Sequence, residues 1–170
     1  MDQISFFQRI LAGKIRKIFS ARKKSVIPFA DVKELLLVIN ADEQTDIAQV
    51  QAVVKDLQNN GKSVRVVELT RNKNYQGNFE VVVYRTFLFI IKFLPVTSSD
   101  ILTRHFDLVL GYSREFSLPL QYFVNMVDSS MIVLPFIDEP NFADISFKLK
   151  NNTLSHFVSQ AIDFLNTIKK

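Results

Sequence analysis

Residues 34–69 carry the pattern that most limits how this chain can fold. Residues 34–40 (ELLLVIN) form a short, continuous apolar run, which is typical of a strand buried on both faces of a parallel sheet. Residues 42–60 then place apolar side chains at helical spacing, and Gly61 suits the left-handed cap that ends a helix. A second strand follows at 63–69. A strand, a helix and a strand with short joints predict a right-handed crossover between two parallel strands.

The same alternation continues to the end of the chain and sets the expected fold class. Residues 79–86 and 87–94 are rich in β-branched and aromatic residues, so one or both are strands, in an order that the pattern leaves open. Further strands are expected at 106–111, 130–136 and 143–149, the last at an edge, and helices at 97–105, 118–127 and 153–168. These elements predict a three-layer α/β/α, Rossmann-like domain with a mostly parallel sheet. The length of 170 residues fits one such domain, over residues 27–170, after a helical appendage at 1–26.

The N-terminal segment predicts an amphipathic, basic helix over residues 3–24. Leu11, Ile15 and Ile18 are among the apolar residues that recur at spacings of three and four, with basic residues on the other side. One alternative is that the helix packs on the domain and leaves its basic face in water. The other is that it docks on a protein partner or on an anionic membrane surface. In that case the contact residues are Arg9, Arg16, Lys17 and Lys23.

Charge is concentrated in that segment. Residues 1–24 hold seven basic side chains and one acidic side chain, whereas the rest of the chain holds 14 basic and 16 acidic ones. The calculated isoelectric point near 9.3 is therefore a property of the N-terminus, and nucleic acid is not expected as a partner. The sequence shows no secretory signal or membrane-spanning run, so we expect a cytoplasmic protein, peripheral to the inner membrane if the helix docks there.

In an open parallel sheet, ligands bind beyond the carboxyl ends of the strands, and this rule selects three loops. The polar residues in them are candidate ligand-binding residues: Asn40, Asp42, Thr70, Arg71, Ser113 and Arg114. The arginines would hold a phosphate, and Asn40 or Asp42 would bind a sugar hydroxyl. The alternative is that they are the capping and turn residues that any α/β protein needs at these positions.

No complete catalytic or cofactor motif is present. The first strand runs into Asn40-Ala41-Asp42 without the glycines of a dinucleotide fingerprint, and no Walker loop occurs. Gly111-Tyr112-Ser113-Arg114-Glu115 matches half of a nucleophile elbow, but its second glycine is missing. His105 and His156 have the sequence surroundings of surface or capping residues, so we expect no catalytic triad. The absence of cysteine excludes thiolate metal sites, and we expect neither a metal nor a cofactor.

The order of elements in the C-terminal half resembles a family of proteins. The segments Phe106 to Leu110, Phe116 to Phe123, Met131 to Pro135, Asn141 to Ile145 and Thr153 to Lys169 resemble an uncharacterised bacterial family of small α/β proteins of about this length. Residues 87–96 are more apolar than that resemblance implies. A weaker likeness, in the strand Phe106-Asp107-Leu108-Val109-Leu110, is to one lobe of glycosyltransferases of the lipopolysaccharide heptose type. Those enzymes bind a nucleotide sugar between two lobes, so this likeness implies the fold but not transferase activity.

Two functions are therefore expected. The first is a non-catalytic interaction or accessory module whose basic helix at 3–24 docks on a partner or membrane. The alternative is a protein that binds a nucleotide, nucleotide sugar or phosphorylated metabolite, or a glycosyltransferase-like enzyme, through the loops after the parallel strands. The apolar segment 81–96 is either a central strand or a strand that a second subunit covers, which would make a homo-oligomer.

Overall fold

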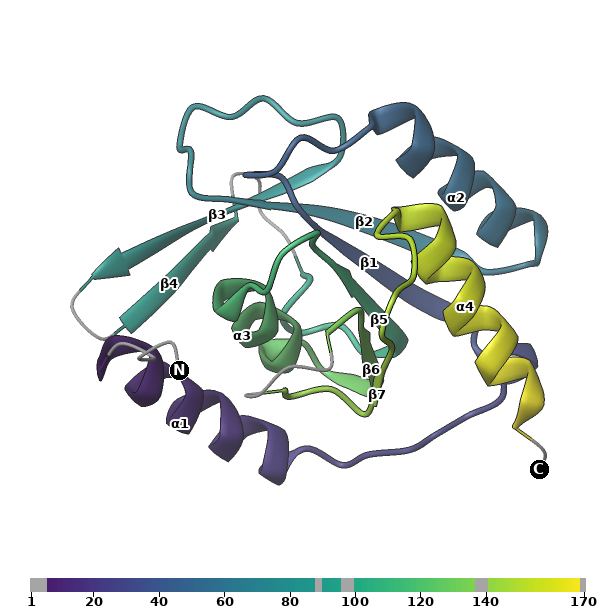
Figure 1. Ribbon diagram of the computed structural model, residues 1–170, viewed down its shortest axis with the longest axis horizontal. Helices are drawn as coiled ribbons and strands as arrows, with labels where there is room; N and C mark the ends of the chain where they lie inside the picture. Colours follow the sequence, from purple (N-terminus) through teal and green to yellow (C-terminus); the bar gives the residue numbers. More distant parts are fainter. Residues whose placement is uncertain (1–5, 88–89, 96–99, 137–140, 169–170) are drawn as a thin grey trace.

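The structure is a computed structural model that describes residues 6–87, 90–95, 100–136 and 141–168. It contains a seven-stranded sheet in the order β4-β3-β2-β1-β5-β6-β7 (Figure 1). The strands are β1 (Glu34–Asn40), β2 (Ser63–Thr70), β3 (Glu80–Phe87), β4 (Ile90–Pro95), β5 (Phe106–Tyr112), β6 (Ser129–Leu134) and β7 (Ile145–Ser146). All neighbouring strands run parallel except β3 and β4. The α/β class predicted from the sequence is confirmed.

The two strands that flank β1 place a crevice at its carboxyl end. From β1 the chain crosses to β2 on one side, and it later returns to β5 on the other side. Asn40 pairs with Leu69 in β2, and Ile39 pairs with Tyr112 in β5. Because the connections leave β1 and β5 in opposite directions, their loops separate at this edge. This is the position at which open α/β sheets bind ligands.

Helices cover both faces of the sheet. Helices α2 (Ile47–Asn59) and α4 (Leu154–Thr167) lie side by side on one face, and α1 (Phe6–Ala21) and α3 (Leu118–Met126) lie on the other (Figure 1). A short 3-10 turn, η1 (Phe29–Asp31), joins the first layer. Two apolar clusters therefore fill the space between sheet and helices, one on each face.

Helix α2 begins later than the sequence pattern suggests. Asp46 is its N-cap, and the Asp46 carboxylate accepts hydrogen bonds from Ala48 N at 3.0 Å and Gln49 N at 3.4 Å. Residues 41–45 form a loop, because the Asp42 and Glu43 carboxylates bind neighbouring segments. At the other end, Gly61 has a φ of 75°, the conformation that favours glycine after a helix.

Helix α1 packs on the domain, the first of the two alternatives that its sequence left open. Leu11 and Ile15 are 1% and 0% exposed and belong to the same apolar cluster as α3. Beyond the helix, Arg22 forms an ion pair with Asp144 in which both side chains are nearly buried. The helix therefore contributes to the core, and residues 3–5 of the predicted helix lie outside the described residues.

The structure corrects the helix expected at 97–105 and the strand expected at 143–149. Residues 100–104 form a single turn and not part of a helix, since Thr103 N and Arg104 N both bond to Asp100 O; residues 97–99 lie outside the described ranges. The strand expected at 143–149 is reduced to β7. The Asp144 carboxylate accepts Ile132 N at 2.8 Å, a donor that a longer edge strand would use.

The segments at 79–86 and 87–94 are both strands, joined as an antiparallel hairpin at the sheet edge. Ile91 and Phe93 of β4 face the core, where the Phe93 ring packs on Phe123 with centroids 5.1 Å apart. Among the residues described, no helix is both long enough and apolar enough to cross a membrane.

Candidate functional site

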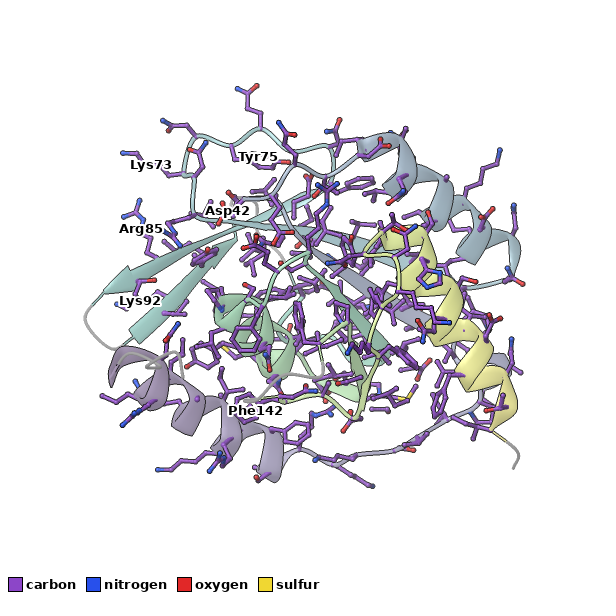
Figure 2. The ribbon with its side chains drawn as sticks, in the orientation of Figure 1. Asp42, Lys73, Tyr75, Arg85, Lys92 and Phe142 are labelled. Atoms are coloured by element: carbon purple, nitrogen blue, oxygen red, sulfur yellow. The ribbon has the colours of Figure 1, made fainter. Side chains whose placement is uncertain are left out.

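A cleft of about 430 Å³ opens at the carboxyl edge of the sheet, beside the crevice at β1. Figure 2 shows Asp42 at this edge, below the loop that carries Lys73 and Tyr75. The charged side chains of its described lining come from the loops after β1, β2 and β5, and further polar ones come from α1 and β3. The described lining residues are Gln8, Leu11, Asn40, Asp42, Glu43, Arg71, Tyr84, Thr86, Ile91 and residues 115–119.

Asp42 ties three strands together at the floor of this cleft. Its Oδ1 accepts hydrogen bonds from Thr70 Oγ1 at 2.7 Å and from Arg71 N at 2.8 Å. Its Oδ2 accepts the Tyr84 hydroxyl at 2.7 Å. Tyr84 is 4% exposed, so its phenol is fixed by the core on one side and by Asp42 on the other. Asp42 therefore ties the end of β2 and Tyr84 within β3 to the loop after β1.

Arg71 is the one cationic side chain in the described part of the cleft lining, and Tyr84 positions it. The Arg71 guanidinium lies over the Tyr84 ring, 5.8 Å from its centroid. A hydrogen bond with Tyr84, followed by electrostatic interactions with Tyr84 and with the Asp42 carboxylate, raises the pKa of Arg71. Burial and the hydrogen bond to Asp42 raise the pKa of Tyr84, against a smaller opposite effect of Arg71. At neutral pH the pair is thus a neutral phenol and an exposed, charged guanidinium held in one place.

Glu43 fills the loop after β5. Its carboxylate accepts hydrogen bonds from Ser113 Oγ at 2.5 Å, Arg114 N at 2.6 Å and Glu115 N at 3.3 Å. Asn40 Nδ2 also donates to Glu43, at 3.2 Å. Backbone N–H groups in such a turn are typical anion-binding groups, and here the chain's own carboxylate already occupies them.

The structure brings some of the predicted ligand-binding residues together and gives others a structural role. Asn40, Asp42 and Arg71 line the cleft. Thr70 and Ser113 are each 1% exposed and bond to Asp42 and Glu43, so they support the loops from beneath.

Arg114 differs from the other predicted residues because its side chain lies beside the Tyr112 hydroxyl, on the α4 side of the sheet. It is not part of the cleft lining. The four basic residues singled out on the N-terminal segment, Arg9, Arg16, Lys17 and Lys23, are all exposed.

Sequence reasoning missed Tyr84, Glu43 and Glu115. Glu43 and Glu115 stand within the predicted loops, and each lies next to a residue that the sequence did select. Tyr84 gave less signal, because it stands inside an apolar run where an aromatic residue indicates core packing. Within the described ranges, no group of three or more histidine, aspartate or glutamate side chains is arranged to hold a metal ion.

Comparison with known proteins places the chain in a family. The model of a family of unknown function, DUF6913, matches residues 5–168. No curated protein and no solved structure shows significant similarity to the chain. The match covers nearly all of the sequence, including every element that lines the cleft, and the chain therefore belongs to the DUF6913 family of unknown function.

Proposed function

We propose that this domain binds a small, hydroxylated molecule that carries one anionic group, such as a phosphate monoester, in the cleft at the carboxyl edge. The observation that carries the proposal is the exposed Arg71 guanidinium, held over the Tyr84 ring inside a cleft of about 430 Å³. Ligand pockets in proteins commonly measure about 300–1,000 Å³. An arginine fixed in this way binds phosphate or carboxylate groups with little loss of side-chain entropy.

The charges of the cleft favour a ligand with a single anionic group over a polyphosphate. Its described lining contains one guanidinium, Arg71, and three carboxylates, from Asp42, Glu43 and Glu115. Glu43 also occupies the backbone N–H groups that a second phosphate would use. The remaining carboxylate and amide oxygens, including those of exposed Glu115, can accept hydrogen bonds from ligand hydroxyls. Among the nucleotides and phosphorylated metabolites expected from the sequence, the cleft therefore favours monophosphates.

The proposal calls for a thermal-shift screen of sugar monophosphates, nucleoside monophosphates and their di- and triphosphate counterparts. A ligand at 100 times its dissociation constant stabilises the native state by about 2.7 kcal/mol. The affinity of the best monophosphate is then measured by calorimetry for the parent and for Arg71→Ala. A hydrogen bond to a charged group contributes about 1.5–3 kcal/mol, so the variant should bind roughly 10- to 150-fold more weakly.

Arg114→Ala is the matched control, because it removes the same charge from a neighbouring loop without touching the cleft lining. Its affinity should equal that of the parent. Equal affinities of the parent and Arg71→Ala would overturn the proposal, as would a screen in which no monophosphate stabilises the protein. The glycosyltransferase alternative stays a prediction: those enzymes bind between two lobes, whereas this cleft lies at the edge of one sheet.

A second candidate function rests on the outer surface of the N-terminal segment. Arg9, Arg16, Lys17 and Lys23 are exposed, while Leu11 and Ile15 of the same helix are buried in the core. Docking would therefore use the charged face alone and would not insert the apolar face. Each basic side chain near an anionic membrane contributes at most about 1 kcal/mol, so four cations support reversible, salt-sensitive binding.

Vesicle sedimentation tests this second function. The parent should bind vesicles that contain phosphatidylglycerol, bind pure phosphatidylcholine vesicles far less, and dissociate as salt is added. The combined change of Arg9, Arg16, Lys17 and Lys23 to Glu should abolish binding. The matched control changes four exposed lysines elsewhere, Lys33, Lys55, Lys148 and Lys150, to Glu. Equal loss in both variants would show a net-charge effect and remove the helix as a specific surface.

A further inference from the structure

A second cavity, of about 390 Å³, lies at the amino edge of the sheet, opposite the cleft. It is lined by residues from the segment after α1 and from the starts of β5 and β6, among them Lys23, His105, Asp128 and Ser130. Because β5 and β6 are parallel neighbours and Phe106 pairs with Ser129, the residues just before β5 and at the start of β6 meet at this edge. This site is separate from the one proposed to bind a ligand.

Three side chains that line this cavity contact one another in the order Ser130, His105, Asp128. The Ser130 hydroxyl oxygen lies 3.2 Å from His105 Nε2. On the other side of the ring, His105 Nδ1 lies 3.2 Å from Asp128 Oδ2. We propose that these residues form an activated-serine site that hydrolyses esters, with Ser130 as nucleophile, His105 as base and Asp128 as the residue that orients His105.

The two ring contacts determine what each nitrogen can do. The Asp128 carboxylate has no proton to donate, so it favours the tautomer that places a proton on the Nδ1 atom facing it. Nε2 then presents its lone pair to the Ser130 hydroxyl. A nucleophile, a base and an orienting acid within hydrogen-bond reach are the geometric signature of acyl transfer through a serine.

The backbone of Ser130 is fixed by hydrogen bonds, whereas the side chain of Asp128 is exposed to water. Ser130 is at the start of β6, and its carbonyl accepts Ser25 N at 3.0 Å. Arg22 binds Ser129 O at 3.2 Å and Ser129 Oγ at 3.1 Å, so the neighbouring residue is fixed as well. The side chains of His105 and Asp128 are 52% and 64% exposed. Water screens the Asp128 charge at that exposure, so we expect slow turnover.

The reaction balances with water as the second substrate. Ser130 Oγ bonds to the ester carbonyl carbon while His105 Nε2 takes the hydroxyl proton. The bond to the leaving alcohol then breaks, and that alcohol takes the proton from His105. Water attacks the acyl group on Ser130 in the same way, which releases the acid and returns the proton to Ser130. Lys23, an exposed residue that lines this cavity, is the cation that we expect to oppose the carbonyl oxygen as it becomes negative.

Labelling with a fluorophosphonate probe tests the proposal directly, because the probe reacts with activated serines and needs no known substrate. Peptide mapping of the full-length protein should find the label on Ser130, and Ser130→Ala should abolish it. His105→Ala should slow labelling about 100-fold or more, the usual contribution of a general base. Asp128→Asn should slow it less. Hydrolysis of a p-nitrophenyl acetate substrate should fall in the same order.

Two controls separate this site from a structural role and from the cleft. Ser159→Ala removes an exposed serine of α4, and Arg71→Ala alters the cleft; both should label like the parent. His105 and Asp128 are exposed, so their variants should keep the melting temperature of the parent. The proposal is overturned if the folded parent is not labelled at Ser130, or if His105→Ala labels at the parent rate.

Discussion

Glu68 shows how one residue can organise a loop. It is 0% exposed on β2, and its two oxygens accept the Tyr75 hydroxyl and Phe79 N, each at 3.0 Å. Gly77 lies so close that a Cβ built there would stand 1.9 Å from Glu68 Oε2. A larger residue at 77 would have to displace the carboxylate. The loop between β2 and β3, which carries Tyr75 in Figure 2, is therefore fixed by the buried Glu68 carboxylate.

Because of the buried Tyr75 phenol and its contact with Glu68, the unfolding free energy of the protein should fall at alkaline pH. Burial, followed by the hydrogen bond to Glu68, raises the pKa of Tyr75 from 10.0 to about 12. The protonated phenol is the form that the fold favours, so its contribution is complete below pH 10 and is lost as pH rises toward about 12. Denaturant unfolding of the parent and of Tyr75→Phe across this range should show a difference in unfolding free energy that shrinks above pH 10. A difference that stays constant would mean that the phenol does not titrate in this environment.

At the scale of elements, α1 is the segment for which the structure added most to what the sequence had predicted. Its pattern indicated a helix with a basic side, but a pattern does not say whether the apolar stripe is covered by the same chain. Here α3 and the sheet cover it, and Phe19 packs edge-on against Phe142 with centroids 6.2 Å apart. The helix is therefore one wall of the core as well as a carrier of surface charge.

Leu11→Ala should consequently destabilise the whole protein. Truncation of a fully buried leucine costs about 2–5 kcal/mol, because it removes buried surface and leaves a cavity. Arg16→Ala, one turn away and exposed, should change the unfolding free energy by no more than about 0.5 kcal/mol. Chemical denaturation of the two variants compares them. A cost for Leu11→Ala as small as that for Arg16→Ala would indicate that α1 detaches in solution.

At the scale of the whole molecule, the sequence predicted the strands and helices, because these follow from the periodicity of apolar residues. It did not predict which way individual loop side chains point. The parallel units around β1, β2 and β5 could be predicted because their apolar runs and cap residues are local signals. The same rule selected the loops from which Asp42 and Arg71 line the cleft, and their role in binding stays a prediction. Ser113 and Arg114 stand in one of those loops, but the first turns into the core and the second toward Tyr112. Nothing in the spacing of the residues encodes that difference.

Contacts between distant segments were the other part that the sequence could not supply. His105, Asp128 and Ser130 carry no shared motif, and they meet only because β5 and β6 are neighbours. The single turn at 100–104 and the short β7 have the same origin, since Arg65 and Arg22 draw Asp100 and Asp144 into ion pairs. Partners from distant parts of the sequence thus override local preference at these positions.

Strand β5 reaches from one candidate site to the other. It starts directly after His105 and ends directly before Ser113, and its seven residues span roughly 23 Å at about 3.3 Å per residue. Substitutions at two sites so far apart, with no contact residue in common, change the unfolding free energy almost independently of each other. Selection can therefore alter the residues of the site at one end of this strand while the site at the other end stays unchanged. Related proteins can then differ at either edge of the sheet and keep the same strand order.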